Sequence, residues 1–296
     1  MLSAPALVTG ATGGVGYAVS EGLARAGRSV VLTGRSPAKG EAALARLRRA
    51  VPGADARFDL LDVSDLGAVA AFAARWQGPL GILVNNAGVM GYRERRATKD
   101  GLEAQLGTNY LGHFALTVRL LPALLEGQAR VVSVSSLAHR RGRIVFDDLN
   151  SERNYSPWRA YSQSKLAMLM FARELQRRAS QHGWPLRSIA AHPGWSATSI
   201  VVNGRGTGLL GRVGQAMFSV MAQSAAAGAL PILYAALDPA AEPGGYYGPA
   251  HMGETRGPSA PALVMPQAKD VTSCERLWSL SEQLTGVHPE GAVAEL

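Results

Sequence analysis

Three side chains in the middle of the chain could carry out acid–base chemistry: Ser136, Tyr161 and Lys165. Tyr161 and Lys165 are four residues apart, so on a helix they would share one face. A tyrosine ordinarily loses its proton at about pH 10, and a neighbouring cation stabilises the phenolate and lowers that pKa. The pair could therefore exchange a proton with a substrate oxygen near neutral pH, and Ser136 could donate a hydrogen bond to the same oxygen.

A glycine-rich turn near the start of the chain has the spacing of a phosphate-binding loop. The run Thr9-Gly10-Ala11-Thr12-Gly13-Gly14-Val15-Gly16 follows a short apolar segment and leads directly into a helical pattern. Glycines let the backbone approach a pyrophosphate, and the N-terminus of a helix attracts its charge. An ordinary glycine-rich turn is the alternative, but the order of strand, turn and helix favours a dinucleotide site. The residues expected to contact the cofactor here are Gly10, Thr12, Gly14, Val15 and Gly16.

The residues after the second expected strand distinguish between the two nicotinamide cofactors. A carboxylate there would bond the adenosine ribose of NAD, but the chain has Thr33-Gly34-Arg35-Ser36. A guanidinium can pair with a 2′-phosphate through two N–H donors, so Arg35 favours NADP (NADPH) and makes NAD less expected. The alternative is that Arg35 is one more surface arginine of an arginine-rich chain. We also expect Asp62 and Val63 to frame the adenine, and Asn86, Ala87 and Gly88 to form the floor beneath the cofactor.

Alternating strands and helices must position these residues. Strand candidates are 6–9, 30–33, 82–84, 131–134 and 188–191, and helix candidates are 15–26, 38–50, 65–76, 101–125 and 158–182. This alternation predicts an α/β fold, a parallel sheet with helices on both faces. No linker or repeat interrupts the chain before 196, so we expect a single domain over 1–296. We expect a substrate loop over 196–214. The tail after Gly244, with a C-terminal extension over 249–296, should be irregular before a short helix over 274–284.

Four motifs taken together resemble the short-chain dehydrogenase/reductase family. They are Thr9-Gly10-x-x-x-Gly14-x-Gly16, Asn85-Asn86-Ala87-Gly88, Ser136, and Tyr161-x-x-x-Lys165. The resemblance runs from about Leu7 to Thr198, with weaker similarity as far as Gly248. It implies a doubly wound (Rossmann) sheet of seven mostly parallel strands in a single domain.

The same resemblance assigns roles to four further residues. Asn109 would bend its helix and hold a water that relays protons to Lys165, completing a catalytic set of Asn109, Ser136, Tyr161 and Lys165. Pro193 and Gly194 match the turn after the sixth strand, and Thr198 the position that bonds the nicotinamide carboxamide. Tyr161 and Lys165 would also contact the cofactor. Relatives often form dimers or tetramers through the helices that carry Asn109 and Tyr161, so a homodimer or homotetramer is expected, although the insert over 137–160 could cover that face in a monomer.

Several segments resemble the retinol-dehydrogenase-like branch of the family. They are 99–103, 109–114, 146–149 and the long gap between Ser136 and Tyr161. The resemblance implies reduction of aldehydes and ketones, often hydrophobic ones, with NADPH. Met168 stands where that branch commonly has asparagine, which weakens the case for a retinoid substrate. No N-terminal apolar helix supports the membrane anchoring that is common among such relatives.

Residues that could contact the substrate are less well marked by the sequence. Trp195, Met217 and Phe218 could line an apolar pocket beyond the strand ends, or could simply pack in the core. Leu137 and His139 follow Ser136, but Arg140 and Arg141 come next, so a solvated loop is as reasonable for His139. The six histidines show no metal-ligand spacing, so no metal is expected.

Composition narrows the class of protein. The net charge of +8 could suggest a nucleic-acid partner, but only four of the 30 basic residues are lysines, and the arginines are scattered. Nucleic-acid binding would require a basic face with interleaved aromatics, so none is expected. The single Cys274 excludes a disulfide framework and suits a cytoplasmic protein. The uncharged stretch 213–237 is long enough to cross a bilayer, but its glycines, glutamines and Pro231 favour a buried helix, so stable membrane insertion is not expected.

The combined features predict an NADP(H)-dependent oxidoreductase that interconverts a carbonyl and an alcohol. Two alternatives remain open. The motifs are compatible with an NADPH-dependent reductase of a carbon–carbon double bond. A non-catalytic NADPH-binding regulator is also conceivable, although such a protein would be expected to have lost Tyr161 or Lys165, and both are present.

Overall fold

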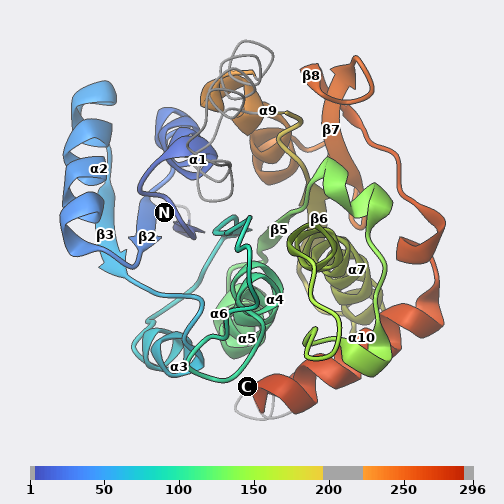
Figure 1. Cartoon of the computed structure of the whole chain (residues 1–296). Coiled ribbons are helices and arrows are strands. Elements are labelled where there is room, and N and C mark those ends of the chain that lie inside the picture. Colours follow the sequence, from blue (N-terminus) through green and yellow to red (C-terminus); the bar gives the residue numbers. More distant parts are fainter. Residues whose placement is uncertain (1–3, 196–222, 290–296) are drawn as a thin grey trace, which may run out of the picture.

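The computed structural model describes residues 4–195 and 223–289, which form a single α/β domain around one eight-stranded sheet (Figure 1). The strand order is β3-β2-β1-β4-β5-β6-β7-β8. Strands β1 to β7 are parallel, and β8 runs antiparallel to β7 at one edge. The strands are β1 Ala6–Val8, β2 Val30–Gly34, β3 Ala56–Leu60, β4 Ile82–Asn85, β5 Arg130–Val134, β6 Arg187–Ala191, β7 Tyr246–His251 and β8 Arg256–Pro261.

Helices cover both faces of the sheet, as the apolar strand runs predict. One face packs against α1 (Gly14–Arg25), α2 (Pro37–Ala50) and α9 (Ala225–Leu237). The other packs against α3 (Leu66–Ala74), the helical run 104–126, α7 (Pro157–His182) and α10 (Val271–Thr285). The run 104–126 consists of α4 Ala104–Leu106, a π-helical turn η1 Gly107–Leu111, α5 Gly112–Arg119 and α6 Leu121–Glu126. Short 3₁₀ turns are η2 Leu137–Arg141, η3 Phe146–Asp148 and η5 Pro266–Ala268.

Alternate residues of each strand serve the two cores. In β1, Leu7 belongs to the cluster beneath α5 and α7, whereas Ala6 and Val8 belong to the cluster beneath α1 and α9. All three side chains are fully buried. This period of two, with both faces covered, explains why the strand reads as an unbroken apolar run.

The order of the strands determines where a ligand can bind. Strand β1 lies between β2 and β4. The sheet grows from β1 through β2 to β3 in one direction, and from β4 through β5 to β8 in the other. The loops after β1 and β4 therefore leave the sheet toward opposite faces and open a crevice at the carboxyl ends of the strands. The glycine run and the Asn85–Gly88 motif both follow these two strands.

The strands and helices that carry the motifs are confirmed, and the strand count is eight rather than the expected seven. The expectation that the tail after Gly244 is irregular is wrong, because β7 and β8 form an antiparallel hairpin there. The sequence did not indicate this hairpin because Pro249, Pro258 and Pro261 lie in its strands. Beyond Tyr247 strand β7 is paired with β8 alone, and prolines are tolerated where a strand has a free edge. The expected C-terminal helix is present as the longer α10.

The segment expected to be a substrate loop, 196–214, lies outside the described residues, as does the first part of the uncharged stretch 213–237. From Ala225 the stretch forms α9, which packs with α1 over the sheet (Figure 1). Within the two described ranges, no helix combines the length and the apolar character needed to cross a bilayer.

Candidate active site

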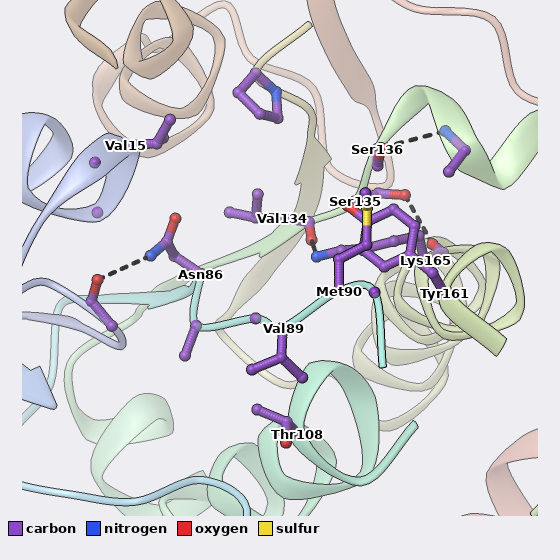
Figure 2. Close-up of a pocket in the computed structure, with 18 of the residues that line it drawn as sticks. Val15, Asn86, Val89, Met90, Thr108, Val134, Ser135, Ser136, Tyr161 and Lys165 are labelled. Carbon is purple, nitrogen blue, oxygen red and sulfur yellow. Dashed lines mark hydrogen bonds between the residues drawn. The ribbon is translucent and has the colours of Figure 1, made fainter. Parts of the chain in front are cut away.

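A cavity of about 1190 Å³ opens at the carboxyl ends of the strands and reaches from the start of α1 to the start of α7. Figure 2 shows Val15 and Asn86 at one side of it and Ser135, Ser136, Tyr161 and Lys165 at the other. The cavity brings together the great majority of the residues predicted for the site. These are Gly10, Thr12, Gly14, Val15, Gly16, Arg35, Asp62, Val63, Asn86, Ala87, Gly88, Ser136, Leu137, Tyr161, Lys165, Pro193, Gly194 and Trp195.

The glycine loop is shaped to receive a phosphate. Gly10 has a φ of +64°, and a Cβ there would meet the backbone of Ala87 at 2.8 Å. A Cβ on Gly16 would lie 2.4 Å from both Asn86 Nδ2 and Gly10 O. In contrast, a Cβ on Gly13 would meet nothing within 4 Å, and no side chain caps the first turn of α1. The first turn of α1 therefore lines the cavity without a side-chain cap on its N–H groups, an arrangement that fits the pyrophosphate of a dinucleotide.

Basic side chains flank the cavity near the end of β2. Arg35 and Lys39, the latter in the first turn of α2, line the cavity and are exposed, and the partly buried Ser36 lies between them. In the described part of the chain neither Arg35 nor Lys39 pairs with a carboxylate. Sequence reasoning named Arg35 for this end of the cavity and missed Lys39, and the signal that could have found it is its place in the first turn of the helix after β2.

A buried hydrogen-bonded chain fixes the floor of the cavity. The Thr9 hydroxyl accepts the amides of Asn86 (2.8 Å) and Ala87 (2.9 Å) and lies 2.9 Å from His113 Nε2. His113 Nδ1 lies 3.1 Å from the carbonyl of Asn109 and must carry the proton in that bond. Burial lowers the pKa of His113 to about 4, so the ring is neutral and its Nε2 accepts from Thr9. The loop after β4 is thereby tied to the helix that carries Asn109.

Ser136, Tyr161 and Lys165 meet where β5 and α7 approach each other. Lys165 is 4% exposed, and its Nζ donates to the carbonyl of Val134 at 3.0 Å and lies 6.0 Å from the centre of the Tyr161 ring. Ser136 and Tyr161 both line this end of the cavity, and Ser136 lowers the pKa of the Tyr161 hydroxyl. Ser136 Oγ accepts the amide of Ala138 at 3.2 Å. The backbone bond from Ala138 leaves the Ser136 proton free to donate, so Ser136 and Tyr161 can both direct protons at one acceptor atom.

Burial changes the acid–base properties of this pair. It raises the pKa of Tyr161, and Ser136 opposes that rise. It lowers the pKa of Lys165 to about 8. The lowering of the Tyr161 pKa expected from the neighbouring cation is therefore not found, because burial disfavours the phenolate more strongly than Ser136 favours it. Tyr161 keeps its proton at neutral pH and is suited to act as an acid.

Asn109 lies below the cavity rather than on its surface. It occupies the π-helical turn η1, the bend expected from the resemblance. Its Oδ1 accepts the amide of Val89 at 2.7 Å, and its Nδ2 donates to Val89 O at 3.0 Å and to Ser164 Oγ at 2.9 Å. Ser164 Oγ in turn donates to the carbonyl of Tyr161 at 2.8 Å. Asn109 thus joins the loop after β4 to the turn of α7 that carries Tyr161.

Some predicted residues lie elsewhere. His139 does not line the cavity and is not in a solvated loop: it is fully buried behind Ser136, its Nδ1 lies 2.7 Å from Ser136 O, and its ring packs against Tyr246. The local run of arginines misled the sequence argument, because Arg140 turns toward Glu254 instead of solvent. Thr198, Met217 and Phe218 lie outside the described residues.

The cavity also includes residues that sequence reasoning missed. Trp158 and Met90 line the cavity near Ser136 and Tyr161, the end called the reacting end below. The ring centres of Trp158 and Tyr161 are 6.0 Å apart. Gly253 and Thr255 reach the cavity from the turn between β7 and β8. No motif marks these positions, since they depend on how distant segments meet. Within the described ranges, no three His, Cys, Asp or Glu side chains gather as metal ligands.

Comparison with known proteins agrees with this geometry. A family model described as short chain dehydrogenase matches residues 4–206. The chain is 38% identical to polyprenol dehydrogenase of Mus musculus, over 95% of this chain and 83% of that protein. It is 37% identical to retinol dehydrogenase 12 of Homo sapiens, over 96% of this chain and 87% of that protein.

Solved structures show the same fold. A crystal structure of a protein from Mycobacterium paratuberculosis is 40% identical, with a TM-score of 0.78 over 97% of this chain and 96% of that one. A metagenomic short-chain oxidoreductase in complex with NADP is 27% identical, with a TM-score of 0.52 over 64% of this chain and 82% of that one.

Proposed function

Because this chain belongs to the retinol-dehydrogenase-like branch of the short-chain dehydrogenase/reductase family, oxidoreductases that act on CH–OH groups, we propose that it interconverts a hydrophobic carbonyl compound and its alcohol with NADP(H). The observation that carries the proposal is the placement of Ser136 and Tyr161 together beside the buried Lys165, at the far end of the same cavity from Arg35.

The chain's own residues account for the proton chemistry. In the reduction direction a carbonyl oxygen placed between Ser136 and Tyr161 accepts a hydrogen bond from the first and a proton from the second. Lys165 lies beneath Tyr161, where its positive charge favours the phenolate that remains. Asn109 and Ser164 hold this turn of α7 against the floor of the cavity. The bound nicotinamide cofactor supplies the hydride for reduction or accepts it in the reverse reaction.

The preference for NADP rests on the basic end of the cavity. Arg35 and Lys39 carry cations beside the first turn of α2, and the residues that end β2 include no carboxylate to bond a free ribose. A 2′-phosphate placed between the two cations would receive charge-assisted hydrogen bonds. The neighbour crystallised with NADP supports the proposal as an analogy.

The proposal of a hydrophobic substrate rests on the other end. Met90, Leu137, Trp158 and Trp195 line the cavity near Ser136 and Tyr161. Trp158 is 48% exposed and Trp195 is 39% exposed, so each has apolar surface available for a ligand. The relatives named polyprenol dehydrogenase and retinol dehydrogenase support the same choice.

The first test replaces Tyr161 with Phe and follows NADPH oxidation with a panel of aldehydes, ketones and an α,β-unsaturated ketone. Loss of the acid should lower turnover by about 10²–10⁴-fold while NADPH binding persists. Tyr155→Phe is the matched control, because the Tyr155 hydroxyl donates to Tyr92 O outside the cavity, and it should retain the wild-type rate. Wild-type turnover in Tyr161→Phe would refute the acid role. A saturated ketone as product would favour the double-bond reductase, and NADPH binding without turnover would favour the regulator.

The second test concerns the cofactor. Arg35→Ala should raise the dissociation constant of NADPH by about 10–100-fold, because a charge-assisted bond to the 2′-phosphate is lost, and should leave that of NADH unchanged. Arg49→Ala, at the exposed far end of α2, removes the same charge away from the cavity and should change neither constant. An unchanged ratio of NADPH to NADH affinity in Arg35→Ala would show that Arg35 does not bind the phosphate.

A further inference from the structure

The turn between β7 and β8 lies against the two loops that border the reacting end of the cavity. The amide of Trp195, in the loop after β6, donates to Thr255 O at 2.9 Å. Arg140, in the turn after Ser136, donates from Nη1 to Gly253 O at 3.4 Å. Gly253 and Thr255 themselves line the cavity. A segment more than 50 residues from either loop in sequence thus forms part of the wall.

Glu254, in the same turn, connects both loops through its carboxylate. Oε1 accepts Arg140 Nη2 at 2.7 Å and the amide of Leu263 at 2.9 Å, and Oε2 lies 3.0 Å from His192 Nε2. The backbone of Glu254 has a φ of +69°, a conformation that side chains other than glycine rarely adopt. The hydrogen bonds and the ion pair of its carboxylate compensate for that strain and hold Glu254 in this conformation.

The bond to His192 determines the tautomer of the imidazole. His192 is fully buried, and its Nδ1 accepts the amide of Gly194 at 3.2 Å. A neutral ring that accepts at Nδ1 must carry its proton on Nε2, and Glu254 is the acceptor for that proton. Gly194 is itself confined, since its φ is +63° and a Cβ there would meet Thr255 O at 2.5 Å. The direction of the Pro193–Gly194 turn therefore depends on His192, which in turn depends on Glu254.

We propose that Glu254 is a positioning residue for the nicotinamide end of the cofactor site, acting on Gly194 through His192. The inference rests on the proposed function in one respect, that a nicotinamide cofactor occupies the cavity with its reactive ring beside Ser136 and Tyr161. Glu254 does not contact the reacting atoms. It holds the wall against which the ring must lie, while the adenosine end, near Arg35, is positioned by other elements.

The test compares a whole cofactor with a fragment. Glu254→Gln keeps the shape of the side chain. An amide has only one acceptor oxygen, so its NH₂ group must face the donor of either Arg140 or His192. We expect the dissociation constant of NADPH to rise about tenfold and kcat to fall. The dissociation constant of adenosine 2′,5′-bisphosphate, which lacks the nicotinamide half, should stay within about twofold. Glu275→Gln, which removes the α10 carboxylate that pairs with Arg177 of α7, is the matched control and should change neither constant.

A second variant asks whether Glu254 acts through His192. His192→Phe removes both bonds of the ring and should itself weaken NADPH selectively. Adding Glu254→Gln in that background should then have little further effect on NADPH affinity, because coupled residues are not additive. Additive effects would refute the route through His192.

The remaining outcomes separate this inference from the proposed function. Equal weakening of NADPH and of the fragment in Glu254→Gln would show a merely structural role, and no weakening of either would show none; both overturn the inference. If the wild type binds NADH in place of NADPH, the proposed cofactor is wrong, and the same comparison made with NADH and ADP decides the role of Glu254.

Discussion

At the scale of one residue, Lys165 links the candidate site to the stability of the fold. Its side chain is 4% exposed, and burial lowers its pKa from 10.5 to about 8. Below pH 8 the protein must hold a buried ammonium ion that pairs with no carboxylate within residues 4–195 and 223–289. An unpaired buried charge is destabilising, so a group placed for chemistry should weaken the folded state at neutral pH.

Lys165→Met should therefore stabilise the ligand-free protein while abolishing turnover. Between pH 8 and 10.5 the unfolded chain binds the Lys165 proton more tightly than the folded protein does, so the wild type gains stability as the pH rises through this window. At pH 7 the variant should exceed the wild type by about 1–3 kcal/mol in free energy of unfolding. The difference should shrink by pH 9.5, as measured by urea denaturation at both pH values.

Lys269→Met provides the control for this comparison, because Lys269 is exposed and its replacement removes a charge without relieving burial. Its effect on the free energy of unfolding should be small and should not change between the two pH values. A Lys165→Met variant that is less stable than the wild type at pH 7 would contradict the argument.

At the scale of elements, the segments that could be predicted are those whose signal is local. The apolar runs of β1, β2, β4, β5 and β6 and the glycines before α1 carry their structure in a few adjacent residues. The same holds for Tyr161 and Lys165, since one turn of α7 brings them together. The catalytic end and the phosphate loop could accordingly be placed from the sequence.

The elements that could not be predicted depend on contacts between distant segments. The hairpin β7–β8 contains three prolines and was expected to be irregular, yet it is held by β6 on one side and by Glu254 on the other. His139 was considered either for substrate contact or for a solvated loop because of its neighbours in sequence, but it is buried and packs against Tyr246. Arg140 resembles a surface arginine until its partner, 114 residues later, is known. Local composition carries no information about such pairs.

At the scale of the whole molecule, α10 closes a face of the domain that would otherwise be apolar. Trp278 is 1% exposed and packs against Phe114 of α5 and Phe171 of α7, with ring centres 5.0 and 5.8 Å away. Arg178 lies over the same ring at 4.3 Å. These are the helices through which relatives were expected to assemble. Any homodimer or homotetramer of this chain must therefore either use another face or include α10 in its interface.

Trp278→Ala should lower the free energy of unfolding by about 3–5 kcal/mol, because it leaves a large cavity between α5, α7 and α10 and exposes the rings beneath. Urea denaturation followed by circular dichroism measures this loss, and light scattering reports the subunit number over the same concentrations.

Val271→Ala is the control, because Val271 is half exposed on the same helix, and it should lower the free energy of unfolding by less than about 0.5 kcal/mol. If α10 seals the domain from within, wild type and Val271→Ala share one subunit number, and Trp278→Ala alone associates further as its apolar face opens. A Trp278→Ala variant within about 1 kcal/mol of the wild type would mean that α10 contributes little to the fold and that this face remains available for assembly.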